Sequence, residues 1–191
     1  MAKLLFFAGS ARKNSTNKKL AKLAAGMARE KGAEVTLIDL KDFEMPLYDG
    51  DLEDEKGLPE NARRFKQLFI DHDGFFIASP EYNSSFSPLL KNSLDWISRT
   101  GEEKEKPLIA YAGKVAALAA TSPGGLGGLR GLVSLRMMLG NVGVTVIPKQ
   151  VAIGSGNQAF DDDGGLGDER QARMLGNVID ALIKTTDRLS G

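Results

Sequence analysis

Five short apolar segments alternate with longer segments of helical spacing, and this alternation constrains the fold more than any other feature of the sequence. The five segments span residues 4–8, 35–38, 74–78, 115–120 and 144–153, the last of them interrupted by Pro148. They are continuously apolar, which is typical of strands buried on both faces of a parallel sheet. The sequence therefore predicts an α/β fold with helices on both faces of the sheet.

The segments between the strands place apolar residues three and four positions apart, as a helix with one buried face does. These stripes are Leu20, Leu23, Ala24 and Met27; Ala62, Phe65 and Phe69; Leu90, Leu94 and Ile97; Leu129, Leu132, Leu135 and Leu139; and Leu175, Val178, Ile179 and Leu182. Five strand–helix units in 191 residues predict a single flavodoxin-like domain over residues 1–191. Its doubly wound five-stranded parallel sheet is expected to have the strand order 2-1-3-4-5. The segment 102–114 matches no predicted element.

The charge balance and the absence of cysteine exclude several classes of function. The 25 basic and 25 acidic residues cancel, so we expect neither a nucleic acid nor a membrane partner. Without cysteine there is no disulfide, thiolate zinc site or cysteine nucleophile.

The single histidine, His72, cannot form a metal cluster, so no metal is predicted, and we expect this histidine at the surface. The apolar segment 4–8 is shorter than the core of a signal peptide, which predicts a cytoplasmic protein.

The loop after the first strand is polar and leads directly into a helix. Ser15 or Thr16 can cap this helix, whose first amides then point outward at the positive end of its dipole. Ser10, Ser15 and Asn17 add short polar side chains and Arg12 adds a planar charged fork, which together suit a dianionic phosphate. A polar turn with an ordinary helix cap is the alternative. The sequence has no Gly-Lys-Ser/Thr, which excludes a Walker A loop.

The loop after the third strand, residues 79–88, consists of turn formers that enclose Glu81, Tyr82, Asn83 and Phe86. Loops held by a rigid scaffold commonly carry function. A flat heterocycle with amide edges would use this loop well, through backbone amides and a neighbouring aromatic ring. The alternative is a simple connector in which Ser87 caps the next helix.

Three motifs occur in a fixed order along the chain. They are Ser10-x-Arg12-x-x-Ser15-x-Asn17, then Ser79-Pro-Glu-Tyr-Asn83, then Leu90-Lys-Asn-x-x-Asp95-Trp96-x-Ser-Arg99. Together they resemble the NADPH-dependent FMN reductase family, which includes bacterial quinone, chromate and azo-dye reductases. The resemblance is strongest from Leu4 to Arg99, and the order of strands and helices still matches to the C-terminus.

The resemblance implies an FMN site formed by three loops. The residues expected around the phosphate are Ser10, Arg12, Ser15, Thr16 and Asn17. Those expected to line the isoalloxazine, largely through main-chain groups, are Pro80, Glu81, Tyr82 and Asn83. Those expected to close the other side of the ring are Thr121, Ser122, Pro123 and Gly124. In this last loop, Pro123 stands where a donor residue is common in the family.

The resemblance also implies the reaction. An FMN-dependent NAD(P)H oxidoreductase would pass hydride from NADPH or NADH through FMN to a quinone or a similar small acceptor (FMN, chromate or an azo compound). The cofactor would carry the chemistry at flavin N5, so no side chain is predicted to be catalytic. Two alternatives are a flavodoxin-type electron carrier without NAD(P)H turnover and a regulatory protein that uses the fold as a sensor. Relatives form dimers or tetramers, which implies a homodimer or homotetramer.

Three other features resemble functional sites but are interpreted as structure. Gly154-x-Gly156-x-x-Ala159 matches the dinucleotide fingerprint, but a turn follows where the fingerprint requires a helix. Asp161-Asp-Asp163 lacks the alternation of an EF-hand loop and is interpreted as a solvated turn. The aromatic residues Phe86 and Trp96 are predicted to be packing residues. For Trp96, the resemblance offers a position near a dimer contact or the flavin rim as the alternative.

Overall fold

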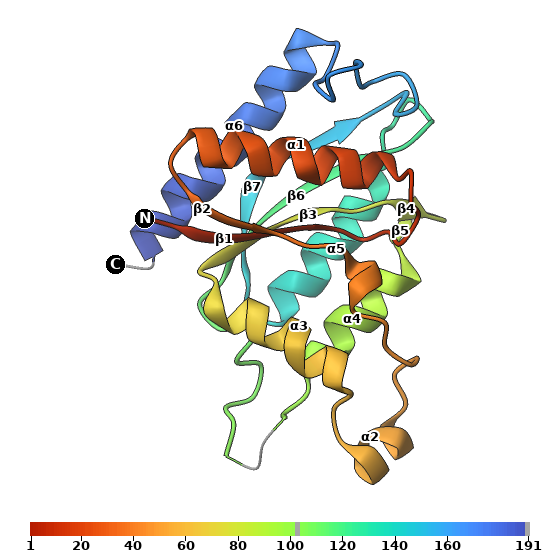
Figure 1. Ribbon diagram of the computed structural model, residues 1–191, viewed down its shortest axis with the longest axis vertical. Helices are drawn as coiled ribbons and strands as arrows, with labels where there is room; N and C mark the ends of the chain where they lie inside the picture. Colours follow the sequence, from red (N-terminus) through yellow and green to blue (C-terminus); the bar gives the residue numbers. More distant parts are fainter. Residues whose placement is uncertain (102–103, 190–191) are drawn as a thin grey trace.

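A five-stranded parallel sheet forms the centre of the computed structural model, which describes residues 1–101 and 104–189 (Figure 1). Its strands are β1 (Lys3–Ala8), β2 (Glu34–Leu37), β3 (Gly74–Ala78), β6 (Val115–Thr121) and β7 (Thr145–Ile153). Their order is β2-β1-β3-β6-β7, and all neighbours are parallel. Counted along these five strands alone, the order is 2-1-3-4-5, so the flavodoxin-like fold is confirmed.

Helices cover both faces of the sheet (Figure 1). Helices α1 (Thr16–Glu30) and α6 (Glu169–Leu189) lie on one face, and α3 (Glu60–Asp71), α4 (Pro88–Ser98) and α5 (Leu129–Asn141) lie on the other. Strand β1 serves both layers: Leu4 and Phe6 belong to the core under α1 and α6, and Leu5 and Phe7 to the opposite core. Burial on both faces explains the continuous apolar runs of the central strands β1, β3 and β6. The edge strands β2 and β7 are only partly buried, unlike the sequence prediction. Within the described ranges, no helix is both long and apolar enough to cross a membrane.

Two predicted helical stripes differ from the buried faces of the structure. In α1 the buried residues include three alanines outside the predicted stripe, Ala21, Ala25 and Ala28, whereas Leu23 and Met27 are only partly buried. In α5 the buried leucines are Leu132, Leu135 and Leu139. Leu129 is 42% exposed because it shares the outer face of the helix with the exposed Val133 and Met137, four and eight positions further on.

The sequence predicts none of three short elements: the 3-10 helix η1 (Leu40–Asp42), helix α2 (Gly50–Lys56), and the hairpin of β4 (Glu81–Tyr82) with β5 (Ser85–Phe86). Helix α2 has no buried residue, so it leaves no hydrophobic pattern to detect. In contrast to the predicted interruption, β7 continues through Pro148, with a shift of register against β6. Proline is tolerated there because β7 is an edge strand.

The unassigned segment 102–114 is partly defined. Residues 102 and 103 lie outside the described residues. Further along, Tyr111 is completely buried and its hydroxyl donates to the carbonyl oxygen of Leu94 at 2.5 Å. Burial raises the pKa of Tyr111 well above its ordinary value. This part of the segment therefore closes the core beside α4.

His72 is buried, so the expected surface position is wrong. Its side chain is 4% exposed and lies where α3 passes into β3. Nδ1 lies 2.6 Å from the carbonyl oxygen of Leu68 and therefore donates to it. Nε2 lies 2.8 Å from Oγ1 of Thr36, whose hydroxyl donates to the neutral ring. Burial lowers the pKa of His72 below its ordinary value.

We expect acidification to destabilise the protein through His72. The unfolded chain takes up a proton on this residue near pH 6.5, whereas the folded protein, with the lowered pKa, excludes it. Stability should therefore fall as the pH drops below about 6.5, by up to about 1.4 kcal/mol per pH unit, until the folded-state pKa is reached. Urea unfolding between about pH 7.5 and 5.5 checks this against His72→Gln, which lacks the titration. Equal losses in the two proteins would contradict the assignment.

Candidate functional site

Three loops meet beyond the carboxyl ends of β1, β3 and β6, where ligands bind in sheets of this kind. They enclose two cavities. The larger, of about 580 Å³, is lined by Gly9, Ser10, Ala11, Arg12, Tyr82, Asn83, Ser87, Pro88 and Leu89. The smaller, of about 140 Å³, is lined by Ser10, Arg12, Asn14, Ser15, Thr16, Asn17, Pro80, Glu81, Tyr82, Thr121, Ser122, Pro123 and Asn157. Every residue predicted for the site lines one of the two, except Gly124. Both cavities share Ser10, Arg12 and Tyr82.

The loop after β1 presents a helix end and a free cation to these cavities. Ser15 caps α1, and its Oγ accepts from the amide of Lys18 at 3.4 Å. Ser10 is buried, and its Oγ accepts from the amide of Arg12 at 3.4 Å. The guanidinium of Arg12 is exposed and makes no ion pair with any of residues 1–101 or 104–189. The arrangement leaves a positive group beside the amide end of α1, which suits an anion.

Asn17 joins two of the loops. It is 3% exposed; its Nδ2 donates to the carbonyl oxygen of Thr121 at 2.9 Å, and its Oδ1 accepts from the amide of Thr121 at 3.0 Å. These bonds fix the first turn of α1 against the end of β6. Thr121 lines the smaller cavity. Its hydroxyl oxygen is buried and has no hydrogen-bond partner in the described structure.

The loop after β3 is a hairpin rather than an irregular loop. Asn83 and Ser84 have φ values of 52° and 66°, as the two central residues of a type I′ turn do. Glycine is favoured at such positions, and Ser84 in its place hides the turn signal in the sequence. Neighbouring residues of a strand point to opposite faces, so the side chains of Glu81 and Tyr82 lie on opposite faces of the hairpin. Tyr82 is 50% exposed and lines both cavities.

Ser87, which the predicted site omits, ties the hairpin to the first loop. Its Oγ donates to the carbonyl oxygen of Gly9 at 2.6 Å and accepts from the amide of Leu90 at 3.1 Å, capping α4. Ser87 thus acts as the predicted helix cap and also lines the larger cavity. The two interpretations of this loop are compatible.

The loop after β6 packs closely against the loop after β7. Gly127 has φ +61°, and a Cβ there would lie 2.6 Å from the backbone of Ile153. A Cβ on Gly154 would lie 2.6 Å from the carbonyl oxygen of Gly125. The amide of Gly156 donates to the carbonyl oxygen of Ser122 at 2.9 Å. The Gly154–Ala159 segment is therefore a supporting loop, as the sequence predicts, and it brings Asn157 to the smaller cavity.

The third sequence motif, residues 90–99, lies on and just after α4 and binds the loop that contains Pro46. The side-chain amide of Asn92 and the indole Nε1 of Trp96 both donate to the carbonyl oxygen of Pro46 at 2.8 Å. Trp96 is completely buried and Phe86 is 9% exposed, which confirms their predicted packing roles. Asn92 and Trp96 hold the chain between η1 and α2 against α4 and line neither cavity.

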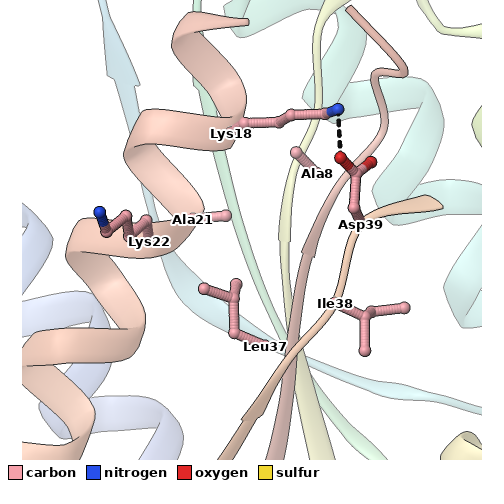
Figure 2. Close-up of a pocket in the computed structure, with 7 residues that line it drawn as sticks. All are labelled: Ala8, Lys18, Ala21, Lys22, Leu37, Ile38 and Asp39. Carbon is pink, nitrogen blue, oxygen red and sulfur yellow. Dashed lines mark hydrogen bonds and ion pairs between the residues drawn. The ribbon is translucent and has the colours of Figure 1, made fainter. Parts of the chain in front are cut away.

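A third cavity, of about 320 Å³, lies between α1 and β2 (Figure 2). Its lining is mostly apolar and includes Ala21, Leu37 and Ile38. Across its edge, Nζ of Lys18 is paired with the carboxylate of Asp39 at 2.5 Å (Figure 2). None of the predicted site residues lines it.

The residues around the first two cavities fit an elongated ligand with a phosphate at one end and a flat polar ring at the other. Arg12, which has no ion pair within the described part of the chain, and the amide end of α1 suit the phosphate. The half-exposed Tyr82 lies further along the lining of both cavities.

Comparisons with known proteins identify similar chains over nearly the full length. A family model described as NADPH-dependent FMN reductase matches residues 2–158. An NAD(P)H-dependent FMN reductase of Pseudomonas aeruginosa is 33% identical over 190 residues, covering 99% of this chain and 97% of that protein. An NADPH:quinone oxidoreductase of Arabidopsis thaliana is 35% identical over 188 residues, covering 96% and 91%. The solved structure of FerB, a flavoenzyme NAD(P)H:(acceptor) oxidoreductase from Paracoccus denitrificans, has a TM-score of 0.83 at 28% identity and covers 98% of both chains.

Proposed function

This chain belongs to the NADPH-dependent FMN reductase family, and from this premise we propose which residues hold its cofactor and which acceptors it reduces. It is an oxidoreductase that uses FMN as cofactor and NAD(P)H as co-substrate. The observation that carries the site assignment is the convergence of the loops after β1, β3 and β6 on two cavities that share residues.

The phosphate end of the proposed site is the amino end of α1. Arg12 supplies a charge-assisted hydrogen bond, and Ser10, Ser15 and Thr16 supply hydroxyls beside the first helical amides. Asn17, whose amide is bound to Thr121, contributes by holding this helix end beside the third loop. The ring end lies over Pro80–Asn83, with Thr121–Gly124 on its other side.

The chain's own task in the reaction is to bind and orient. FMN, when bound, supplies the hydride-accepting N5 atom, so the mechanism needs no acid, base or metal ligand from the protein. The bond from Ser87 to Gly9 and the bonds from Asn17 to Thr121 hold the three loops at fixed spacing. Tyr82 lies at the rim of both cavities, where an incoming acceptor would meet it. We propose no catalytic side chain.

We propose a quinone or a similar small acceptor, such as free FMN, chromate or an azo compound. The similarity to an FMN reductase and to a quinone oxidoreductase over more than nine-tenths of the chain supports this choice. The acceptor and NAD(P)H would use the same open side of the site in turn.

Addition of NADPH to the FMN-loaded protein under anaerobic conditions is expected to bleach the flavin absorbance, and a quinone should restore it. The FMN-loaded protein without NADPH is the control. Reduction only by a partner protein would favour the flavodoxin-type carrier. A preparation that stays colourless after exposure to FMN would contradict the proposed site.

We further propose a homodimer or homotetramer, formed by a single flavodoxin-like domain of residues 1–191 and located in the cytoplasm. An exposed apolar stripe on and before α5 supports self-association: Leu126, Leu129, Val133 and Met137 are 57%, 42%, 64% and 65% exposed. Exposed apolar surface in one patch is typical of a protein interface. A cytoplasmic location agrees with the use of NAD(P)H and with the absence of cysteine.

A further inference from the structure

We propose that Glu81 is a positioning residue, which fixes the β4–β5 hairpin to the first turn of α5 and so places the hairpin backbone beside the FMN ring. This inference rests on the FMN site proposed above. In this role Glu81 does not contact the ligand through its carboxylate, because the carboxylate binds α5 on the side of the hairpin that faces the helix.

Both carboxylate oxygens of Glu81 are bound to α5. Oε2 accepts from the amide of Gly131 at 3.1 Å, and Oε1 accepts from Nε of Arg130 at 3.0 Å. Oε1 also lies 2.9 Å from Nη2 of Arg130, and the Glu81 side chain is only 10% exposed. The Arg130 side chain is 62% exposed, so water partly screens its ion pair with Glu81. The bond from the amide of Gly131 to the nearly buried carboxylate is therefore the stronger attachment.

Helix α5 needs this carboxylate because its own sequence caps it poorly. Its N-cap residue is Gly128, which has no side chain to accept a hydrogen bond, and its first turn contains no acidic residue. The amides at the start of a helix lack internal partners and carry partial positive charge. Glu81 satisfies the third helical amide, that of Gly131, from a separate element of the chain.

The hairpin also lies directly against the helix backbone. A Cβ on Gly131 would lie 3.1 Å from the carbonyl oxygen of Ser85 and 3.2 Å from Cβ of Glu81. The hydroxyl oxygens of Ser85 and Ser134 are 3.4 Å apart. The first turn of α5 therefore contacts both strands of the hairpin.

The hairpin requires such support because it is very short. Each of its strands has two residues, and isolated two-stranded hairpins are at best marginally stable. Two non-glycine residues at its tip, Asn83 and Ser84, have positive φ, a conformation that favours glycine. With Glu81 bound to α5, Tyr82 projects from the opposite face of the strand toward the cavities.

Amide hydrogen exchange and riboflavin binding together test this role. In Glu81→Ala, the amides of residues 82–86 should exchange at least about tenfold faster in the cofactor-free protein, while those of β1 and α1 stay unchanged. Riboflavin and FMN affinity should both fall about tenfold, because the defect lies at the ring and not at the phosphate. Glu81→Gln keeps an acceptor oxygen for the amide of Gly131 and should recover part of both losses. The matched control is Glu169→Ala, which removes an exposed ion pair with Arg173 and should change neither.

Unchanged exchange of the hairpin in Glu81→Ala would overturn the proposal. Faster exchange throughout the protein would also overturn it, because Glu81 would then serve general stability alone. If the wild-type protein bound neither riboflavin nor FMN, the proposed function would fail, and the exchange comparison would still decide whether Glu81 anchors the hairpin.

Discussion

Replacing Gly127 by alanine is expected to lower the free energy of unfolding by about 2–4 kcal/mol, as the sum of backbone strain and overpacking. Gly127 has φ +61°, and the new Cβ would lie 2.6 Å from backbone N and C of Ile153 and 2.7 Å from C of Ala152. Those atoms belong to a strand of the sheet and its end, so they cannot move aside cheaply. Urea unfolding measures the loss.

The matched control for this change is Gly125→Ala, two positions earlier in the same loop. A Cβ on Gly125 meets nothing within 4 Å, and its φ lies outside the positive region. We expect this variant to stay within about 0.5 kcal/mol of the wild type. If both variants lost the same stability, the loop would be sensitive to any substitution, and the close approach to Ile153 would not explain the effect.

Arg12→Ala is expected to weaken FMN binding by about 1.5–3 kcal/mol, or roughly 10- to 150-fold, through loss of a charge-assisted hydrogen bond to the phosphate. Arg12 lines both cavities, and its guanidinium has no ion pair among the described residues to compensate. Riboflavin, which lacks the phosphate, should bind the variant and the wild type equally. Fluorescence titration of the cofactor-free protein with each flavin measures both affinities.

Lys13→Ala is the control for Arg12→Ala, because it removes a neighbouring exposed charge that lines neither cavity. It should leave the affinity for FMN within about twofold of the wild type, since an exposed charge acts weakly through screening water. Unchanged FMN affinity in Arg12→Ala, or an equal loss in Lys13→Ala, would remove Arg12 from the phosphate site.

The architecture was open to prediction because burial on both faces leaves a strong pattern. Segment 74–78 is predicted with the bounds that β3 has in the structure, and the strand order follows from the alternation of strands and helices. Helix α2 was not predictable in this way, because it buries no residue. The surface position expected for His72 is wrong because its charged neighbours in sequence, Asp71 and Asp73, say nothing of the contact with Thr36 in β2.

The sequence predicted which loops form the candidate site, but it did not predict in which direction each side chain of these loops points. Ser10, Arg12 and Tyr82 line both cavities, as strand ends and motif spacing suggest. The direction of the Glu81 side chain depends on the short hairpin. The hairpin could not be recognised from the sequence, because Ser84 and not glycine occupies a turn position of positive φ. The bonds of Asn17 join residues 104 positions apart in the chain, a contact that no local pattern reports.

The two faces of the β4–β5 hairpin have different roles. Its inner side carries Glu81 against α5, and its outer side carries Tyr82 at the cavity entrance. A substitution at Tyr82 alters what the entrance admits without touching the attachment to the helix. Side chains of different size at position 82 can therefore reshape the rim of both cavities while the two hydrogen-bonded contacts of Glu81 with the helix stay in place.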